Sequence, residues 1–293
     1  MTETPSLTVG LPVFNAEKYL PAALDSILAQ TFDEFVLVVS DNASTDTTEE
    51  IVRSYASADE RIEYERAAEN RGLVWNFNHV FSRCRTEFFR WAASDDVVAP
   101  TCFERCVTTL REAPANVVLT FPRTKLIGPS GEPLGEADDL LDLRSDSPHS
   151  RLQQVVLNMV YGNVVFAVMR SAALRQTRGH GNYPSADRVL AAELALLGRF
   201  WELPEPLFFR RRHESMSRTP EMTASEYGRH LDPANTRAEN ELWRLFREHL
   251  AAIHIAPLTE RERLLSYAAF AAAWTRRHAA LRTRAQALLT RSR

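Results

Sequence analysis

Glycine is scarce in this 293-residue chain, which holds only ten, and glycine-rich phosphate loops are missing. Neither GxGxxG nor GxxxxGK[ST] occurs anywhere in the sequence. Such loops hold the phosphates of a dinucleotide or a nucleoside triphosphate through backbone N–H groups. Their absence argues against a Rossmann dehydrogenase and a P-loop kinase. A diphosphate-bearing ligand would therefore have to be neutralised by other groups.

Cysteine is scarce as well: Cys84, Cys102 and Cys106 form an odd set without a CxxC pair. No disulfide framework or zinc pattern follows, which favours a reducing, cytoplasmic location. The first ten residues lack the apolar core of a signal peptide. The longest nearly apolar stretches, 155–169 and 264–274, are shorter than the roughly 20 residues that span a bilayer. We therefore expect a protein that is not integral to a membrane.

Charge of one sign is not in excess, because the chain has a net charge of −3. A nucleic-acid-binding protein usually carries a basic surface, so no nucleic-acid partner is expected. The segment 261–293 differs, since its eight arginines against one acidic residue give about +7. Apolar residues in this segment predict an amphipathic helix; they are Leu264, Leu265, Ala268, Ala272, Leu281, Ala285, Leu288 and Leu289.

Two interpretations of this basic helix stay open. Either it packs on the domain and leaves a solvated arginine face, or it contacts an anionic membrane surface or another anionic partner. The expected location is cytoplasmic, and peripheral at the inner face of the membrane if the helix binds lipid. A homodimer is a further expectation for the partners.

Short β-type runs alternate with helical patterns in the first 120 residues, and they lie at 7–11, 35–40, 61–65, 88–93 and 117–122. The helical pattern at 17–30 places its leucines and Ile27 on one stripe. Strands that alternate with helices form βαβ units and a largely parallel sheet covered on both faces. The sequence therefore predicts an α/β fold.

The character of the chain changes at 128–150, which is rich in Gly, Pro, Asp and Ser. This composition predicts a flexible loop or a small lid near a site. A helix at 151–160, a strand at 163–169 and a helix at 187–198 are expected to follow. The last seventy residues have helical patterns.

Polar groups follow three of the expected strands, at 12–17, 41–46 and 94–96. In open parallel sheets, ligands bind at the carboxyl ends of the strands. These groups have no obvious local partner in the sequence. Together they predict a concave polar site at one edge of the sheet.

The first strand end supplies Pro12, Phe14, Asn15 and Glu17. The ring of Phe14 is suited to cover a flat ring of a ligand, and Asn15 and Glu17 are suited to bind a sugar or a base. The alternative for Asn15 is to cap the helix expected at 16–30, and the two roles are compatible.

The second strand end supplies Asp41, which lies too early to cap the following helix. Its carboxylate can accept an N–H group of a ligand such as a pyrimidine base, or it can stabilise the turn. Asp46 is expected to act as a cap of the helix that follows it.

The third strand end holds two adjacent acids in 91-WAASDDVVAP-100. Asp95 and Asp96 can hold a metal, cap the helix after Pro100, or act as acid and base. Mg²⁺ and Mn²⁺ prefer carboxylate, water and phosphate oxygens. A divalent ion held here would neutralise a diphosphate without a glycine loop.

These stretches resemble one known family, the inverting glycosyltransferases of family 2, which have the GT-A fold. Its N-terminal signature is similar to GLPVFNAEKYLPAALDSILAQTFDEFVLVVSDNASTDTT at 10–48 almost throughout. Its later segments resemble, in the same order, ENRGLVWNFN at 69–78, WAASDDVVAP at 91–100, GHGNYPSADRVLAAELALLGRF at 179–200 and LFFRRRHESMS at 207–217. The ordered set is more specific than any single match.

The resemblance implies a fold and the boundaries of its domains. It implies a Rossmann-like, mostly parallel central sheet of GT-A type, flanked by helices and followed by a C-terminal helical extension. The catalytic domain would cover 1–217, with a nucleotide-sugar half at 1–122 and an acceptor half at 123–217. The extension would cover 218–293.

The resemblance also implies roles for the residues of the first two strand ends. Asp41 would bind the nucleobase of the donor. Pro12, Phe14, Asn15 and Glu17 would lie beside it in the nucleotide-binding site.

For the later motifs, the resemblance implies that Asp95 contacts the ribose or the diphosphate and that Asp96 ligates Mn²⁺ or Mg²⁺. His213 stands where many members contact the metal or the diphosphate. Asn70 and Arg71 stand in the segment that borders the nucleotide.

Asp187 stands at the position of the general base of the family. The family usually has Glu-Asp there, whereas this chain has Ala186-Asp187, so Asp187 stands alone. Tyrosine is common where Phe14 and Phe209 stand, and the tail that ends in His213 is about one residue shorter than usual.

The expected chemistry is an inverting transfer of a sugar from a UDP- or dTDP-linked donor to a hydroxyl of a glycan, a lipid-linked molecule or a small molecule. A carboxylate at the start of a helix, Asp187, can remove the proton of the acceptor hydroxyl. The alternative for Asp187 is to cap its own helix.

Two other functions are alternatives to glycosyl transfer. A sugar nucleotidyltransferase shares the sheet type but usually has a glycine-rich loop with a basic residue after the first strand, where this chain reads PVFNAE. A non-catalytic partner that binds a nucleotide sugar is the other, and detection of product or of donor hydrolysis would exclude it.

Overall fold

The structure of the chain is a computed structural model, which describes residues 5–137, 139–214, 222–235 and 240–291. The side chains of residue 224 and of residues 280–291 lie outside this description.

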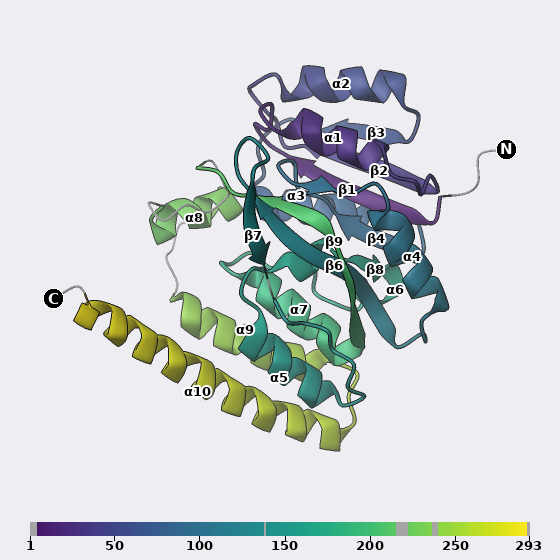
Figure 1. Cartoon of the computed structure of the whole chain (residues 1–293). Helices are drawn as coiled ribbons and strands as arrows, with labels where there is room; N and C mark the ends of the chain where they lie inside the picture. Colours follow the sequence, from purple (N-terminus) through teal and green to yellow (C-terminus); the bar gives the residue numbers. More distant parts are fainter. Residues whose placement is uncertain (1–4, 138, 215–221, 236–239, 292–293) are drawn as a thin grey trace.

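One mixed sheet organises the described part of the chain (Figure 1). Its strands follow the order β3-β2-β1-β4-β8-β6-β9-β5, with β7 beside β6. The strands are β1 (Leu7–Val13), β2 (Phe35–Asp41), β3 (Ile62–Arg66), β4 (Phe88–Trp91), β5 (Val97–Val98), β6 (Val117–Ile127), β7 (Pro133–Ala137), β8 (Val168–Arg170) and β9 (Arg199–Arg211).

The predicted α/β fold is confirmed. Strands β1, β2, β3 and β4 pair in parallel, as the alternation of strands and helices predicted. The second half of the sheet is less regular, because β8 pairs antiparallel to both β4 and β6. The long pair of β6 and β9 is parallel again.

Two hydrophobic cores cover the two faces of the sheet. Successive residues of a strand point to opposite faces, and Phe88 and Phe89 of β4 accordingly lie in different cores. One core contains residues of α1 (Leu20–Leu28), α2 (Thr48–Ala58) and α4 (Cys102–Glu112). The other contains residues of α3 (Leu73–Ser82), α5 (Pro148–Asn158), the 3-10 helix η1 (Asn163–Phe166) and α7 (Ala186–Leu197).

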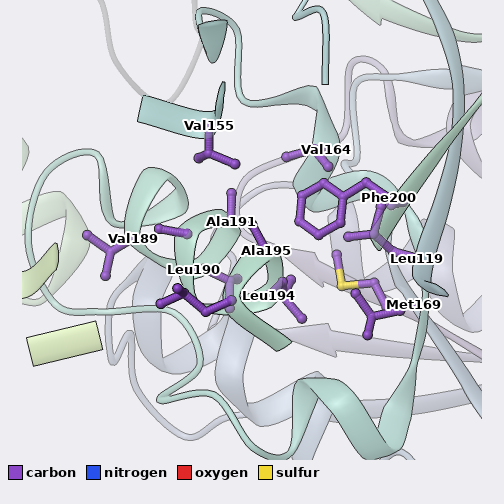
Figure 2. Close-up of a cluster of buried hydrophobic side chains, with 14 of the residues drawn as sticks. Leu119, Val155, Val164, Met169, Val189, Leu190, Ala191, Leu194, Ala195 and Phe200 are labelled. Atoms are coloured by element: carbon purple, nitrogen blue, oxygen red, sulfur yellow. The ribbon is translucent and has the colours of Figure 1, made fainter. Parts of the chain in front are cut away.

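Helix α7 forms the centre of the second core. Its sequence is apolar on nearly all sides, which is typical of a helix that is buried all round. Figure 2 shows side chains of α7 close to those of the sheet and of neighbouring helices, among them Leu119, Val155, Val164, Met169 and Phe200. The N-terminal end of α7, which carries Asp187, is thereby held in a fixed place at the edge of the sheet.

The C-terminal segment is helical, as predicted, with α8 (Ala224–Leu231), α9 (Glu241–Ile255) and α10 (Glu260–Arg291). Helices α9 and α10 lie against α5 and α7 and contribute to their core (Figure 1). A short helix, α6 (Ser171–Leu174), follows β8. In the described part of the chain, no helix has the length and apolar character needed to cross a membrane.

The buried face of α10 differs from the predicted one. Leu264 is 70% exposed and Leu265 is 40% exposed, and Ala268 and Ala272 are exposed too. The side chains of the remaining predicted positions (Leu281, Ala285, Leu288 and Leu289) lie outside the described residues. The prediction is wrong for the first half of the stripe because aromatic packing sets the phase of the helix: Phe270 is buried and stacks on His249 of α9, with the ring centroids 5.2 Å apart.

The packing of His249 predicts a dependence of stability on pH. Burial lowers the pKa of His249 from 6.5 to about 4, so the unfolded chain binds a proton at a pH at which the folded chain does not. The stability contributed by neutral His249 is therefore present above pH 6.5 and is lost as the pH falls toward 4. When the pH is lowered from 7.5 to 4.5, the free energy of unfolding should fall in both proteins. We expect the fall to be about 2–3 kcal/mol smaller in His249→Phe than in the parent chain.

Urea unfolding at the two pH values measures this difference. The variant His254→Gln is the matched control, because His254 lies on the same helix and is exposed. Equal pH dependence in the parent chain and His249→Phe would contradict the prediction.

The segment 128–150 is more ordered than predicted. Strand β7 forms an antiparallel hairpin with β6, and Leu141 and Leu143 are buried in the second core. Leu143 also bridges to Phe200 of β9. The described part of this segment is thus a hairpin followed by an extended stretch whose leucines are anchored in the core, rather than a flexible loop.

Candidate active site

A cavity of about 860 Å³ opens where β1 and β4 end, beside the first turn of α7. Nine of the eleven candidate residues line it: Pro12, Phe14, Asn15, Glu17, Asn70, Asp95, Asp96, Asp187 and His213. Asp41 and Arg71 do not. The predicted concave polar site at the carboxyl ends of the strands is thus present.

The loop after β1 is fastened to the loop after β2 by its polar side chains. Oδ1 of Asn15 accepts the N–H of Thr45 (2.8 Å), and Oε2 of Glu17 accepts the N–H and the hydroxyl of Thr47 (3.1 and 2.7 Å). Helix α1 begins only at Leu20. The interpretation of Asn15 as its cap is therefore wrong, and Asn15 instead has φ +48° in the left-handed region, where asparagine is tolerated.

The same loop presents the aromatic ring of Phe14 to the cavity. Phe14 lines the cavity and is 40% exposed. An aromatic ring held by a hydrogen-bonded loop offers a flat apolar surface to a ligand.

Asp41 has local partners, contrary to the expectation from the sequence. Its carboxylate is fully buried and accepts the N–H of Ser44 (2.8 Å), the hydroxyl of Tyr64 (3.0 Å) and a guanidinium N–H of Arg66. These contacts are those of the turn-stabilising alternative. Its contact with a nucleobase stays a prediction. In this structure, Arg66 and Tyr64 both donate hydrogen bonds to Oδ2 of this carboxylate.

Asp46 accepts a backbone N–H group of the helix that follows it, as predicted, although it does not occupy the N-cap position. Its Oδ1 accepts the N–H of Thr48 in the first turn of α2 (3.0 Å), and its Oδ2 accepts the N–H of Glu17 (3.1 Å). The helix itself begins at Thr48, so Thr47 occupies the N-cap position.

The two residues of the segment after β3 lie differently. Oδ1 of Asn70 accepts N–H groups of Asn42 and Gly72, both at 2.9 Å, and Asn70 lines the cavity. The guanidinium of Arg71 lies over the ring of Trp75, 4.4 Å from its centroid, and Arg71 lines a separate neighbouring hollow. Contact of Arg71 with a nucleotide in the main cavity would require its side chain to turn.

The acidic pair lies between two strands that are far apart in sequence. Asp95 and Asp96 directly precede β5, which pairs antiparallel with β9 through Val97 and Phe209. This pairing places the acids beside the end of β9. Helix α4 begins at Cys102 with Thr101 at its N-cap position, so the pair does not cap that helix.

Arg211 at the end of β9 fastens the acidic pair. Its backbone N–H donates to Oδ1 of Asp96 (2.8 Å), and its buried guanidinium donates to the carbonyl of Asp95 (2.9 Å). The same guanidinium donates to the carbonyls of Gly128 and Pro129, both at 3.1 Å. One arginine thus ties the acidic loop to the turn between β6 and β7.

The electrostatics of the pair favour a cation. Asp96 is 7% exposed, and burial together with the charge of Asp95 raises the pKa of Asp96 to about 8. A buried carboxylate beside a second one is stabilised by a divalent ion. Nε2 of His213 lies 2.9 Å from Oδ2 of Asp95. The contact of His213 with a metal or a diphosphate stays a prediction.

The donor set is small but chemically suitable. Among the residues that the structure describes, no group of three or more His, Cys, Asp or Glu side chains is arranged to hold a metal ion. Mg²⁺ is commonly bound through one or two carboxylates, with water and substrate phosphates as its other ligands. Asp95 and Asp96 on the wall of a cavity fit that mode of binding.

Asp187 lies in the first turn of α7 and lines the cavity. The N-cap position belongs to Ser185, so the interpretation of Asp187 as the cap is wrong. Gly162 faces its carboxylate: a Cβ atom at Gly162 would lie 2.3 Å from Oδ2 of Asp187, and its φ of +72° also favours glycine. The backbone at Gly162 therefore makes room for this carboxylate.

Sequence reasoning missed a buried acid that shapes this wall. The carboxylate of Asp139 accepts the N–H groups of Val160 (2.8 Å), Tyr161 (2.6 Å) and Asn163 (3.0 Å). These bonds hold the loop that carries Gly162. A carboxylate in a Gly- and Asp-rich segment gives no sequence signal of burial, so only the structure identifies it.

The model of the family described as "Glycosyl transferase family 2" matches residues 8–177, more than half of the chain. The chain belongs to glycosyl transferase family 2. A relative described as the uncharacterized glycosyltransferase RT0329 of Rickettsia typhi is 30% identical over 126 residues, which are 43% of this family 2 chain and 38% of that protein. The match thus spans about two fifths of the length of that curated relative.

Solved structures agree with the family. The structure of S. aureus TarS 1-349 in complex with UDP-GlcNAc matches 88% of this family 2 chain and 69% of that chain, with a TM-score of 0.64 and 19% identity. Mannosyltransferase PcManGT from Pyrobaculum calidifontis, in complex with GDP-Man and Mn²⁺, matches 98% of this chain and 81% of that chain, with a TM-score of 0.54 and 19% identity. The likeness confirms the predicted GT-A type fold with C-terminal helices.

Proposed function

We propose that this family 2 chain moves a sugar from a nucleoside diphosphate sugar, UDP- or dTDP-linked, to a hydroxyl acceptor with inversion at the anomeric carbon. One observation carries the proposal: a single cavity brings together the acidic pair after β4, His213 after β9 and Asp187 on α7. Family membership and the nucleotide-sugar complexes of TarS and PcManGT support it.

The donor half of the site is assigned to the loops after β1, β2, β3 and β4. Phe14 offers a flat surface to the base, and Asn70 lines the same cavity. Asp95 would face the ribose or the diphosphate, and Asp96 would hold Mn²⁺ or Mg²⁺. When bound, such an ion offsets the charge that the leaving diphosphate gains.

The acceptor half is assigned to the wall that carries Asp187. The acceptor oxygen forms a bond to the anomeric carbon, the bond from that carbon to the diphosphate oxygen breaks, and its electron pair leaves with the nucleotide. Asp187 takes the proton of the acceptor hydroxyl. A single displacement from the face opposite the leaving group inverts the anomeric centre. The contribution of Asp187 to the rate comes mostly from its position beside the acceptor hydroxyl.

The direct test is to incubate the protein with UDP- and dTDP-sugars, Mn²⁺ and candidate acceptors, and to measure nucleotide release and product. NMR of the product then shows the anomeric configuration. Release of the nucleotide, with transfer or with slow hydrolysis, would exclude a purely binding partner. A sugar nucleotidyltransferase would instead consume a nucleoside triphosphate, and nothing in the family or the cavity favours it.

Gly162→Ala tests the placement of the base. The added methyl group would meet the carboxylate of Asp187, so we expect the carboxylate to be displaced and nucleotide release to fall by about tenfold to a hundredfold. The affinity for UDP should stay within about twofold, because Gly162 does not belong to the loops assigned to the donor.

Isothermal titration with UDP and a rate assay separate the two effects. Gly131→Ala is the matched control, since Gly131 also has a positive φ (+90°) but no atom lies within 4 Å of its added Cβ. A rate for Gly162→Ala equal to that of Gly131→Ala would contradict the placement.

A further inference from the structure

His180 lines the same cavity as Asp187. Its backbone is fixed to α3 from both sides: its N–H donates to Oδ1 of Asn78 (2.9 Å), and its carbonyl accepts from Nδ2 of Asn78 (2.8 Å). Its ring lies against Phe77, with the ring centroids 5.1 Å apart. The position of the imidazole is therefore set by α3, independently of the sequence around Asp187.

The imidazole has hydrogen-bonding capacity that the described protein does not use. Its Nδ1 is buried and has no hydrogen-bond partner among the described residues. A buried polar nitrogen without a partner destabilises the fold, and a phenylalanine would pack against Phe77 without that penalty. A ligand that enters the cavity can supply the hydrogen-bond partner that Nδ1 of His180 lacks.

The charge state of the ring fits a hydrogen-bonding role. Burial lowers the pKa of His180 below its usual value, while the charge of Asp187 and the backbone of Gly181 act in the opposite direction. The ring is accordingly neutral at neutral pH, with one nitrogen as donor and the other as acceptor. Asp187 lies seven residues further along the chain, in the first turn of α7, and lines the same cavity as His180.

We propose that His180 binds the acceptor sugar next to its reacting hydroxyl, so that the pair of His180 and Asp187 selects an acceptor with two neighbouring hydroxyls. The inference rests on the proposed function, with Asp187 as the base. A donor hydrogen bond to the reacting oxygen would withdraw the electron pair that attacks the anomeric carbon. The imidazole therefore serves the reaction better on the adjacent hydroxyl, where it orients the acceptor without weakening the nucleophile.

The test compares His180→Phe, which keeps a ring against Phe77, with His180→Gln, which keeps hydrogen-bonding groups. His254→Gln is the control, since His254 is exposed on α9. Nucleotide release from UDP-GlcNAc, other UDP-hexoses and dTDP-hexoses is measured with Mn²⁺. The acceptor is first water, then a panel of methyl glycosides and n-propanol. For methyl glycosides we expect kcat/KM of His180→Phe to fall by roughly tenfold and that of His180→Gln by less.

The other readouts separate this role from a structural one. Release with water, transfer to n-propanol and the KM for the donor should stay within about twofold of the parent chain in His180→Phe. Unchanged transfer to methyl glycosides in His180→Phe would overturn the proposal, and so would an equal loss with water or an altered donor KM. A parent chain that hydrolyses the donor but uses none of the glycosides would overturn it too. A parent chain that releases no nucleotide from any of the UDP- and dTDP-sugars would instead refute the proposed function itself.

Discussion

Asp187→Asn is expected to abolish sugar transfer while leaving nucleotide binding nearly intact. The substitution keeps the shape of the side chain beside Gly162, so the cavity wall need not move. It removes the group that takes the proton of the acceptor hydroxyl, and loss of a general base lowers a rate by about 10²–10⁴-fold. The loops assigned to the donor follow other elements, namely β1, β2, β3 and β4, so UDP affinity should change by less than about twofold.

Two measurements decide this prediction: the rate of transfer or donor hydrolysis, and the affinity for UDP in the presence of Mn²⁺. The control Asp33→Asn makes the same chemical change at an exposed position before β2. Full activity of Asp187→Asn would remove Asp187 as the base. A parallel loss of UDP affinity would show instead that the variant disturbs the donor half of the site.

The candidate site was predictable where polar residues follow apolar runs. Phe14 and Asn15 follow β1, and Asp95 lies in the loop that follows β4. Parallel strands end at one edge of a sheet, so the convergence of these residues follows from local patterns. What those side chains bind was not predictable in the same way. The pattern leaves Asp41 without a partner in sequence, but Tyr64 and Arg66 reach it from the neighbouring strand β3.

The surroundings of the acidic pair depend on contacts that no local pattern carries. The two residues of β5 pair with β9 across more than 100 positions of sequence, and this register alone brings Arg211 and His213 to the pair. The buried face of α10 could not be predicted for the same reason. In the sequence, the leucines that prove to be exposed form a more regular apolar stripe than the residues that prove to be buried. The rings of Phe270 and His249 fix its rotation, and only the packed structure shows that they meet.

Asp96→Asn is expected to remove the metal-dependent part of nucleotide binding. The amide oxygen can still accept the N–H of Arg211, so the loop keeps its fastening, but the charge that would attract Mn²⁺ or Mg²⁺ is lost. Loss of a carboxylate ligand should weaken UDP binding in the presence of Mn²⁺ by about a hundredfold or more, since even outer-shell changes weaken metal binding 10–100-fold. The affinity that remains should be the same with and without EDTA.

Stability separates this effect from misfolding. Because burial and Asp95 raise the pKa of Asp96 to about 8, its charged form destabilises the metal-free fold at pH values above its ordinary pKa. The neutral asparagine should therefore unfold at no lower temperature than the parent chain without metal, and Mn²⁺ with UDP should raise the Tm of the parent chain alone. A parent chain whose UDP affinity is changed neither by EDTA nor by Asp96→Asn would show that the acidic pair holds no metal. The pair would then act on the donor only through Asp95, the residue that Arg211 and His213 both contact.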